Sequence, residues 1–145
     1  MCARTTPTIA IDAMGGDIGL DTTLGAAALA LKQNPNLTFI LVGKHEEISA
    51  HRLFADLDQS RVNLHHASQI VGMDEPPSSV LRHKNDSSMW RAIELVKEGK
   101  ADAVVSAGNT GALMATSRYI LKMLPGIARP AICATVPSKT GMCIG

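Results

Sequence analysis

The sequence predicts an α/β fold with a mostly parallel sheet and helices on both faces. Two observations predict it. Short apolar segments alternate along the chain with longer segments in which apolar residues recur at helical spacing. In addition, residues 37–42 form an apolar run, which is typical of a strand covered on both faces of a parallel sheet.

The strand predictions rest on apolar, β-branched runs that polar residues, glycine or proline bring to an end. The first run ends at Asp12, and the third alternates between apolar and polar residues. The predicted strands cover residues 8–11, 37–42, 61–66, 103–105 and 131–136, and another strand begins within residues 142–145.

The helices of the first half are predicted from caps and from apolar spacing. Asp21 or Thr22 caps a helix that residues 34–36 end. Its buried stripe consists of Leu24, Ala27, Ala28 and Leu31. Residues 45–57 are a further helix on weaker spacing, and residues 78–83 are a short one.

The helices of the second half begin at polar residues that favour the N-cap position. Ser87 or Ser88 caps a helix that ends at Gly99, with Met89, Ile93 and Val96 on its buried face. Asn109 and Thr110 cap the last helix, which Pro125-Gly126 stops. The residues predicted for one face of that helix are Leu113, Ser117, Ile120 and Leu124.

Composition indicates one globular domain, since the chain has 145 residues, 46% of them hydrophobic. The net charge of +1 and the lack of basic clusters with interleaved aromatics exclude nucleic acid as an expected partner. Three cysteines without metal-ligand spacing favour reduced thiols in a cytoplasm, with Cys133 buried and inert. No run reaches the roughly 20 apolar residues of a membrane helix, and the start lacks a signal peptide.

We expect residues 1–7 to be a polar tail and residues 8–145 to be the N-terminal part of a longer single domain, because the last predicted strand is cut short. No metal site is predicted. His65 and His66 are adjacent in a strand and point to opposite faces, and the other histidines lack ligand spacing. The residues predict no cofactor either.

The stretch from Ala103 to Ala115 carries the main functional prediction. A strand, a turn with Ser106 and Gly108, and a helix start with Gly111 follow one another there. Unpaired first-turn N–H groups, the helix dipole and glycines without Cβ together favour an anion, most often phosphate. The alternative interpretation is that the same residues form an ordinary strand-to-helix turn with a good N-cap and bind no ligand.

A second glycine-rich loop follows the first strand. Residues 13–19 match neither the P-loop nor the dinucleotide fingerprint, but Gly15 and Gly16 let backbone approach a ligand. Asp12 and Asp17 flank them and are suited to bind a metal, orient a base or accept loop amides. Alternatively, Asp17 only braces its own turn.

Two cations precede the Ser87-Ser88 cap. An anion bound at that cap would meet backbone donors, two hydroxyls, and the charges of Arg82 and Lys84. A solvated pair of charges on a loop is the alternative.

Three motifs together resemble one family, the PlsX-type phosphate acyltransferases. They are Ile-Asp-Ala-Met-Gly-Gly-Asp at 11–17, Arg-His-Lys-Asn-Asp-Ser-Ser-Met at 82–89 and Val-Ser-Ala-Gly-Asn-Thr-Gly-Ala-Leu-Met at 105–114. The resemblance covers roughly residues 8–137. It implies a fold related to isocitrate/isopropylmalate dehydrogenases, incomplete here because family members are more than twice as long.

The resemblance also implies an activity. Such an enzyme moves a fatty acyl group from acyl carrier protein to inorganic phosphate, and the acyl phosphate feeds a membrane glycerol-3-phosphate acyltransferase in bacterial phospholipid synthesis. Full-length members are expected to be cytoplasmic homodimers that associate peripherally with the inner membrane face. No cofactor is implied.

On this basis the expected catalytic residues are Asn109, Lys84 and Asp12. The residues expected to bind phosphate or acyl phosphate are Gly15, Gly16, Asp17, Arg82, Ser87, Ser88, Ser106, Gly108, Thr110 and Gly111. The alternatives are another phosphate-using transferase of this fold, such as a phosphotransacetylase, and a truncated, inactive chain that at most binds acyl carrier protein.

Overall fold

The computed structural model describes residues 6–138 and 141–144. It contains a parallel sheet in the order β3-β2-β1-β4, which confirms the predicted α/β class. The four strands are β1 (Thr8–Asp12), β2 (Thr38–Gly43), β3 (Val62–His66) and β4 (Ala103–Ser106). The two central strands, β1 and β2, are the most apolar of the four, because helices cover both faces of the sheet there.

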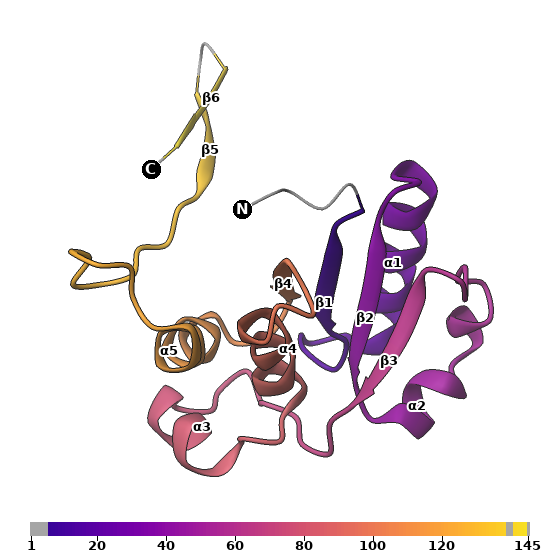
Figure 1. Cartoon of the computed structure of the whole chain (residues 1–145), viewed down its shortest axis with the longest axis horizontal. Coiled ribbons are helices and arrows are strands. Elements are labelled where there is room, and N and C mark those ends of the chain that lie inside the picture. The colour runs from indigo at the N-terminus through magenta and orange to yellow at the C-terminus, as the bar shows by residue number, and fades with distance from the viewer. Residues whose placement is uncertain (1–5, 139–140, 145) are drawn as a thin grey trace.

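Helices α1 (Leu20–Gln33) and α4 (Ser88–Lys97) lie on opposite faces of the sheet (Figure 1). On one face Leu24, Ala27 and Leu31 of α1 pack with residues such as Phe39 and Leu41. The alternate residues of the same strands point to the other face, where the α4 residues Ala92 and Leu95 pack with Ala10 and Val42. This confirms the predicted stripe of α1, of which Ala28 is only half-buried.

Helix α5 (Thr110–Leu121) packs on the side of α4 that faces away from the sheet (Figure 1). Met89 and Ile93 of α4 meet Ala112 and Ile120 of α5 in one apolar cluster. The helix ends at Leu121, three residues before the predicted Leu124, because Lys122 adopts a positive φ of 68°. Leu124 is consequently 76% exposed, and its predicted place on the buried face is wrong.

The segment predicted as one helix over residues 45–57 is two short pieces. α2 (His45–Ser49) and the 3-10 helix η1 (Arg52–Phe54) are separated by a bend at Ala50 and His51. This break explains why the apolar residues of 45–57 do not recur at the regular spacing of a single helix. α3 (Pro77–His83) agrees with the short helix predicted there.

The predicted strand at 131–136 is also shifted. Residues 131–134 have no regular structure, and a hairpin forms from β5 (Thr135–Ser138) and β6 (Gly141–Ile144), which extends away from the rest of the chain in Figure 1. Cys133 is exposed, so the prediction of a buried thiol is wrong. Cys2 and the side chain of Cys143 lie outside the described residues.

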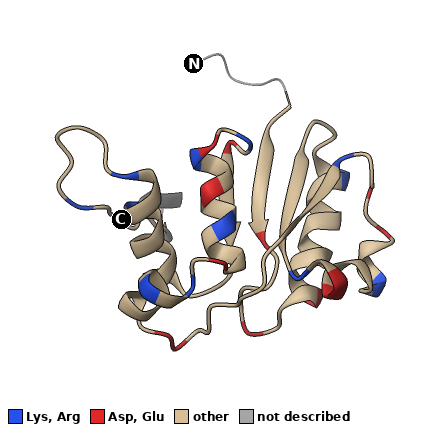
Figure 2. Ribbon diagram, turned by 60° about the horizontal axis from the view of Figure 1, so that its bottom comes forward, with Lys and Arg blue, Asp and Glu red and all other residues tan. Residues whose placement is uncertain are grey.

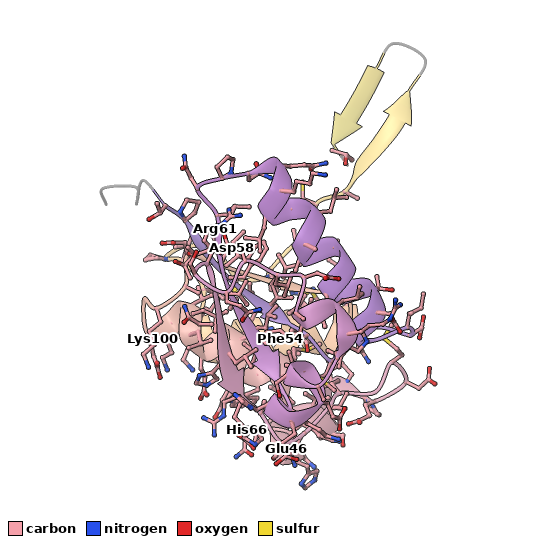
Figure 3. The ribbon with its side chains drawn as sticks, turned by 90° about the vertical axis from the view of Figure 1, so that its right-hand side faces the viewer. Glu46, Phe54, Asp58, Arg61, His66 and Lys100 are labelled. Atoms are coloured by element: carbon pink, nitrogen blue, oxygen red, sulfur yellow. The ribbon has the colours of Figure 1, made fainter. Side chains whose placement is uncertain are left out.

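Arg61 closes the C-terminal end of α1. Its guanidinium donates to the carbonyls of Leu31, Asn34 and Pro35 at 3.0–3.1 Å and to Asp58 at 2.8 Å; Figure 3 labels Arg61 and Asp58 side by side. These carbonyls have no partner within the helix, so one cation fixes the end of α1 against the start of β3. Hydrogen bonds from Ser60 and then Arg61 lower the pKa of Asp58.

Candidate functional site at the carboxyl ends of β1 and β4

The carboxyl ends of β1 and β4 place Asp12 beside Ser106. The two residues are register partners, and the Asp12 Oδ2 atom accepts a hydrogen bond of 2.7 Å from the Ser106 hydroxyl. Asp12 is only 2% exposed, and its other oxygen, Oδ1, is buried without a hydrogen-bond partner among the described residues. A buried acceptor without a donor is unusual, so this atom calls for an explanation.

The glycine loop after β1 lies directly over this pair. A Cβ on Gly15 would stand 2.6 Å from Asp12 Oδ2, closer than real Cβ atoms approach, and in a tight contact of 3.1 Å with the Gly108 nitrogen. Gly16 has a φ of 92° and lies against Ala107. The structure therefore brings together the two glycine-containing segments that the sequence singled out.

The turn from β4 into α5 is held by its own polar groups. The Gly108 N–H donates to Ser106 Oγ at 3.0 Å, and the Ala112 N–H donates to Asn109 Oδ1 at 3.0 Å, so Asn109 is the N-cap as predicted. Within residues 6–138 and 141–144, the N–H groups of Thr110 and Gly111 donate to no other residue. These two amides and the positive end of the helix dipole remain available for an anion.

The Asn109 side chain also joins α5 to a distant loop. Its Nδ2 group donates to the carbonyls of Met73 at 2.8 Å and Glu75 at 2.9 Å, with Gly72 at 3.4 Å. With Oδ1 engaged in the cap, both ends of the amide are in use. In this structure Asn109 positions the helix start; its predicted contact with phosphate stays a prediction.

Lys84 is tied to the same loop. Its Nζ donates to the Ile70 carbonyl at 2.9 Å and lies 3.2 Å from Glu75 Oε1. The hydrogen bond from the Gly72 N–H, and then Lys84, lower the pKa of Glu75, which keeps that carboxylate charged. Glu75 thus offsets the charge that Lys84 was predicted to offer an anion, whereas Arg82 is exposed on α3.

Ser87 and Ser88 are buried and face inward. Ser87 Oγ accepts from the Trp90 N–H at 3.2 Å and donates to the Lys84 carbonyl at 2.7 Å, which makes Ser87 the N-cap of α4. The Ser88 N–H donates to the Gln69 carbonyl at 3.1 Å. The Ser87 hydroxyl thus has a structural role as a cap, and binding of a ligand by either serine stays a prediction.

Charges do not gather at one place around the site. Figure 2 shows acidic and basic residues interspersed along α4 and the neighbouring loops. Asp17 is exposed on the glycine loop. Attraction for an anion at the strand ends therefore rests on backbone amides more than on paired cations.

The cavities near this edge are separate. Asp12 and Ala107 line a hollow of about 270 Å³ between α1 and β4, whereas Thr110 lines another of about 500 Å³ beside residues 121–132. The amides of Thr110 and Gly111 thus belong to an open edge and are not enclosed together with Asp12 by the described residues. In the same part of the chain, no three His, Cys, Asp or Glu residues are grouped to hold a metal ion.

No described helix combines the length and apolarity that crossing a bilayer demands.

The links from Asn109 and Lys84 to residues 70–75 were not predicted, because 9 to 37 residues separate the partners and no local pattern marks them. The sequence likewise indicated Asp12 and Ser106 separately, with no pattern that pairs them.

Comparison with known proteins agrees with these motifs. A family model described as fatty acid synthesis protein matches residues 7–144. A phosphate acyltransferase from Dichelobacter nodosus is 65% identical over 139 residues, which are 96% of this chain and 40% of that protein. Those from Alkalilimnicola ehrlichii and Legionella pneumophila are each 56% identical over 135 residues, 92% of this chain and 40% of each relative. The chain thus spans about 40% of the length of these curated relatives.

Proposed function

Because the chain belongs to the fatty acid synthesis protein family, whose curated members are named phosphate acyltransferases, we propose that it is the phosphate-binding part of such an enzyme. The acyl donor is a long-chain acyl thioester of acyl carrier protein, and inorganic phosphate is the acceptor. In the reaction an oxygen of phosphate forms a bond to the thioester carbonyl carbon and the carbon–sulfur bond breaks. The products are acyl phosphate and the free thiol of the carrier protein.

The observation that carries this proposal is the open start of α5. Thr110 and Gly111 present unpaired amides on a rigid turn, which Ser106 and Asn109 hold in place. Fixed amides bind the oxygens of phosphate without needing a cation, and they lose little entropy on binding because the turn is already ordered. The same donors are suited to stabilise negative charge on a carbonyl oxygen during transfer.

Partners and location follow from the substrates in this proposal. Acyl phosphate is a reactive mixed anhydride with an apolar chain, so it is best delivered to a membrane acyltransferase that esterifies glycerol 3-phosphate for phospholipid synthesis. We propose that the whole protein is a cytoplasmic homodimer that associates peripherally with the inner membrane face.

The test uses the product of the complete reading frame that encodes these residues. Incubated with inorganic phosphate and a long-chain acyl carrier protein, it should release the carrier thiol and form acyl phosphate, which hydroxylamine traps as a hydroxamate. Omitting phosphate should abolish both signals. Use of acetyl coenzyme A in place of the long-chain substrate would indicate a phosphotransacetylase instead, and no turnover of either thioester would contradict the proposal.

A further inference from the structure

The buried oxygen Asp12 Oδ1 is the most informative feature that the proposed reaction leaves unexplained. Its partner atom Oδ2 is held by Ser106, whose oxygen in turn accepts from the Gly108 N–H. Gly15 lies directly over Oδ2. The carboxylate is therefore fixed in one orientation, with Oδ1 as its free acceptor, and it lies against the turn that opens α5.

A carboxylate in this place conflicts with a simple anion site. The amides of Thr110 and Gly111 favour negative charge, whereas Asp12 repels it. Lys84, one of the two cations predicted for the site, is already paired with Glu75 at 3.2 Å. A fully deprotonated oxyanion would present only lone pairs to Oδ1, so this buried oxygen would still lack a donor.

The conflict disappears when the anion carries a proton. Hydrogen phosphate, the dianion that is present at neutral pH, has one O–H group, while sulfate has none. An O–H donor would give Oδ1 the hydrogen bond that it lacks, and the remaining oxygens would accept from the amides.

Resting on the proposed function, we propose that Asp12 is a specificity-determining residue that selects a protonated oxyanion by accepting the O–H of hydrogen phosphate at Oδ1. Asp12 is only 2% exposed, and the amides of Thr110 and Gly111 lie on an open edge outside the hollow that Asp12 lines. One phosphate therefore reaches both only if the loop at residues 14–16, which packs between Asp12 and the Gly108 nitrogen, shifts. Gly15 and Gly16 give that loop the backbone freedom to do so. During transfer, the same proton ends on the sulfur of the departing thiol, and the reaction stays balanced without another reagent.

The test is calorimetric titration of the full chain with four tetrahedral anions at matched ionic strength and mildly alkaline pH, where all four are mainly dianions. As dianions, phosphate and arsenate carry a proton, whereas sulfate and monofluorophosphate do not. The wild-type protein should bind the two protonated anions at least about tenfold more tightly than the other two. Equal affinity for phosphate and monofluorophosphate would overturn the proposal without any variant.

Two variants sharpen the result. Asp12→Asn keeps an acceptor for Ser106 but replaces the charge, and it should bring the phosphate-to-sulfate affinity ratio to within about twofold. Asp56→Asn, which changes an exposed carboxylate after η1, should keep the wild-type ratio. A folded Asp12→Asn protein with the full preference would refute the assignment. Absence of binding of every anion to the folded wild-type protein would overturn the proposed function as well.

Discussion

Asn109 shows how one side chain can tie the start of a helix to a loop that is distant in the sequence. Its oxygen caps α5 and its amide nitrogen donates to carbonyls of residues 72–75, so one side chain joins the helix start to that loop. This link helps to fix the direction in which the amides of Thr110 and Gly111 point. Mutations at Asn109 should therefore affect stability as well as anion binding.

Two substitutions at Asn109 distinguish its cap of α5 from its link to the loop at residues 72–75. Asp and Ser cap a helix about as well as Asn, but Asn109→Asp sets a carboxylate oxygen against the carbonyls of Met73 and Glu75. We expect Asn109→Asp to lower the free energy of unfolding by about 1–3 kcal/mol, and by more than Asn109→Ser, in urea titrations. An Asp variant as stable as the Ser variant would show that the link to the loop contributes little.

The ionisation of Asp86 should make the stability of the fold depend on pH in the acid range. The hydrogen bond from the Ser68 hydroxyl and then that from Arg91 lower the pKa of Asp86 from 3.8 to about 2. The stabilisation that this carboxylate provides is present above the unfolded value of 3.8 and is lost as the pH falls through about 2.

Unfolding measured along that pH range tests this effect. The difference in unfolding free energy between the wild-type protein and Asp86→Asn should be largest above the unfolded pKa and shrink steadily below it. A difference that does not change with pH would show that the ion pair with Arg91 is not what stabilises the wild type.

At the scale of elements, the site is a contact between two loops that follow neighbouring parallel strands. The glycine loop after β1 packs against the turn after β4 so closely that Gly15 has no room for a Cβ. Parallel strands bring such loops to one edge of the sheet, which is where open α/β folds bind their ligands.

Two Gly→Ala variants distinguish packing from backbone freedom. Gly15→Ala should place a methyl group 2.6 Å from Asp12 Oδ2 and destabilise the protein by about 1–3 kcal/mol. Gly25→Ala, in the middle of α1 with no atom within 4 Å of the new Cβ, should stabilise it by about 0.5–1 kcal/mol. Thermal unfolding of both variants measures this, and a neutral Gly15→Ala would contradict the close packing.

The elements also show what a sequence can predict. Runs such as residues 37–42 and the stripe of α1 specify strand and helix because burial on particular faces selects their pattern. The predicted cap of α1 at Asp21 or Thr22 is wrong, since the helix begins at Leu20 after Gly19, which has a φ of 70° and gives no side-chain cap. The ends at Leu121 and at Ser49 depend on backbone conformations that no local pattern marks.

For the whole molecule, the order of strands and helices along the chain was largely predictable. The hydrogen bonds and ion pairs that connect distant segments at the candidate site were not. The alternation of segments implied a parallel sheet, and the sheet implied that residues 12–16 and 106–111 share one edge. The ties from Asn109 and Lys84 to residues 70–75 depend on how α3 and its preceding loop fold back, which spacing along the chain does not encode.

The exposed surface of α5 and the segment that follows it are also a property of the whole molecule. Leu124, Ile127 and Ile132 are each more than half exposed, and Val105 on the edge strand β4 is 53% exposed. The relatives are about 2.3 to 2.4 times as long as this chain, since matches of 135 to 139 residues cover 40% of each of them. The proposed activity is therefore to be tested on the whole protein, whereas the proposed anion site consists of described residues only.

Two-dimensional amide NMR of the chain during a phosphate titration would show directly whether the start of α5 binds the anion. On titration with inorganic phosphate, the amide signals of Gly16, Gly108, Thr110 and Gly111 should move most and together, while those of β3 should stay in place. Saturable shifts confined to other surfaces, such as the exposed Arg82 on α3, or no shifts at all, would contradict the account.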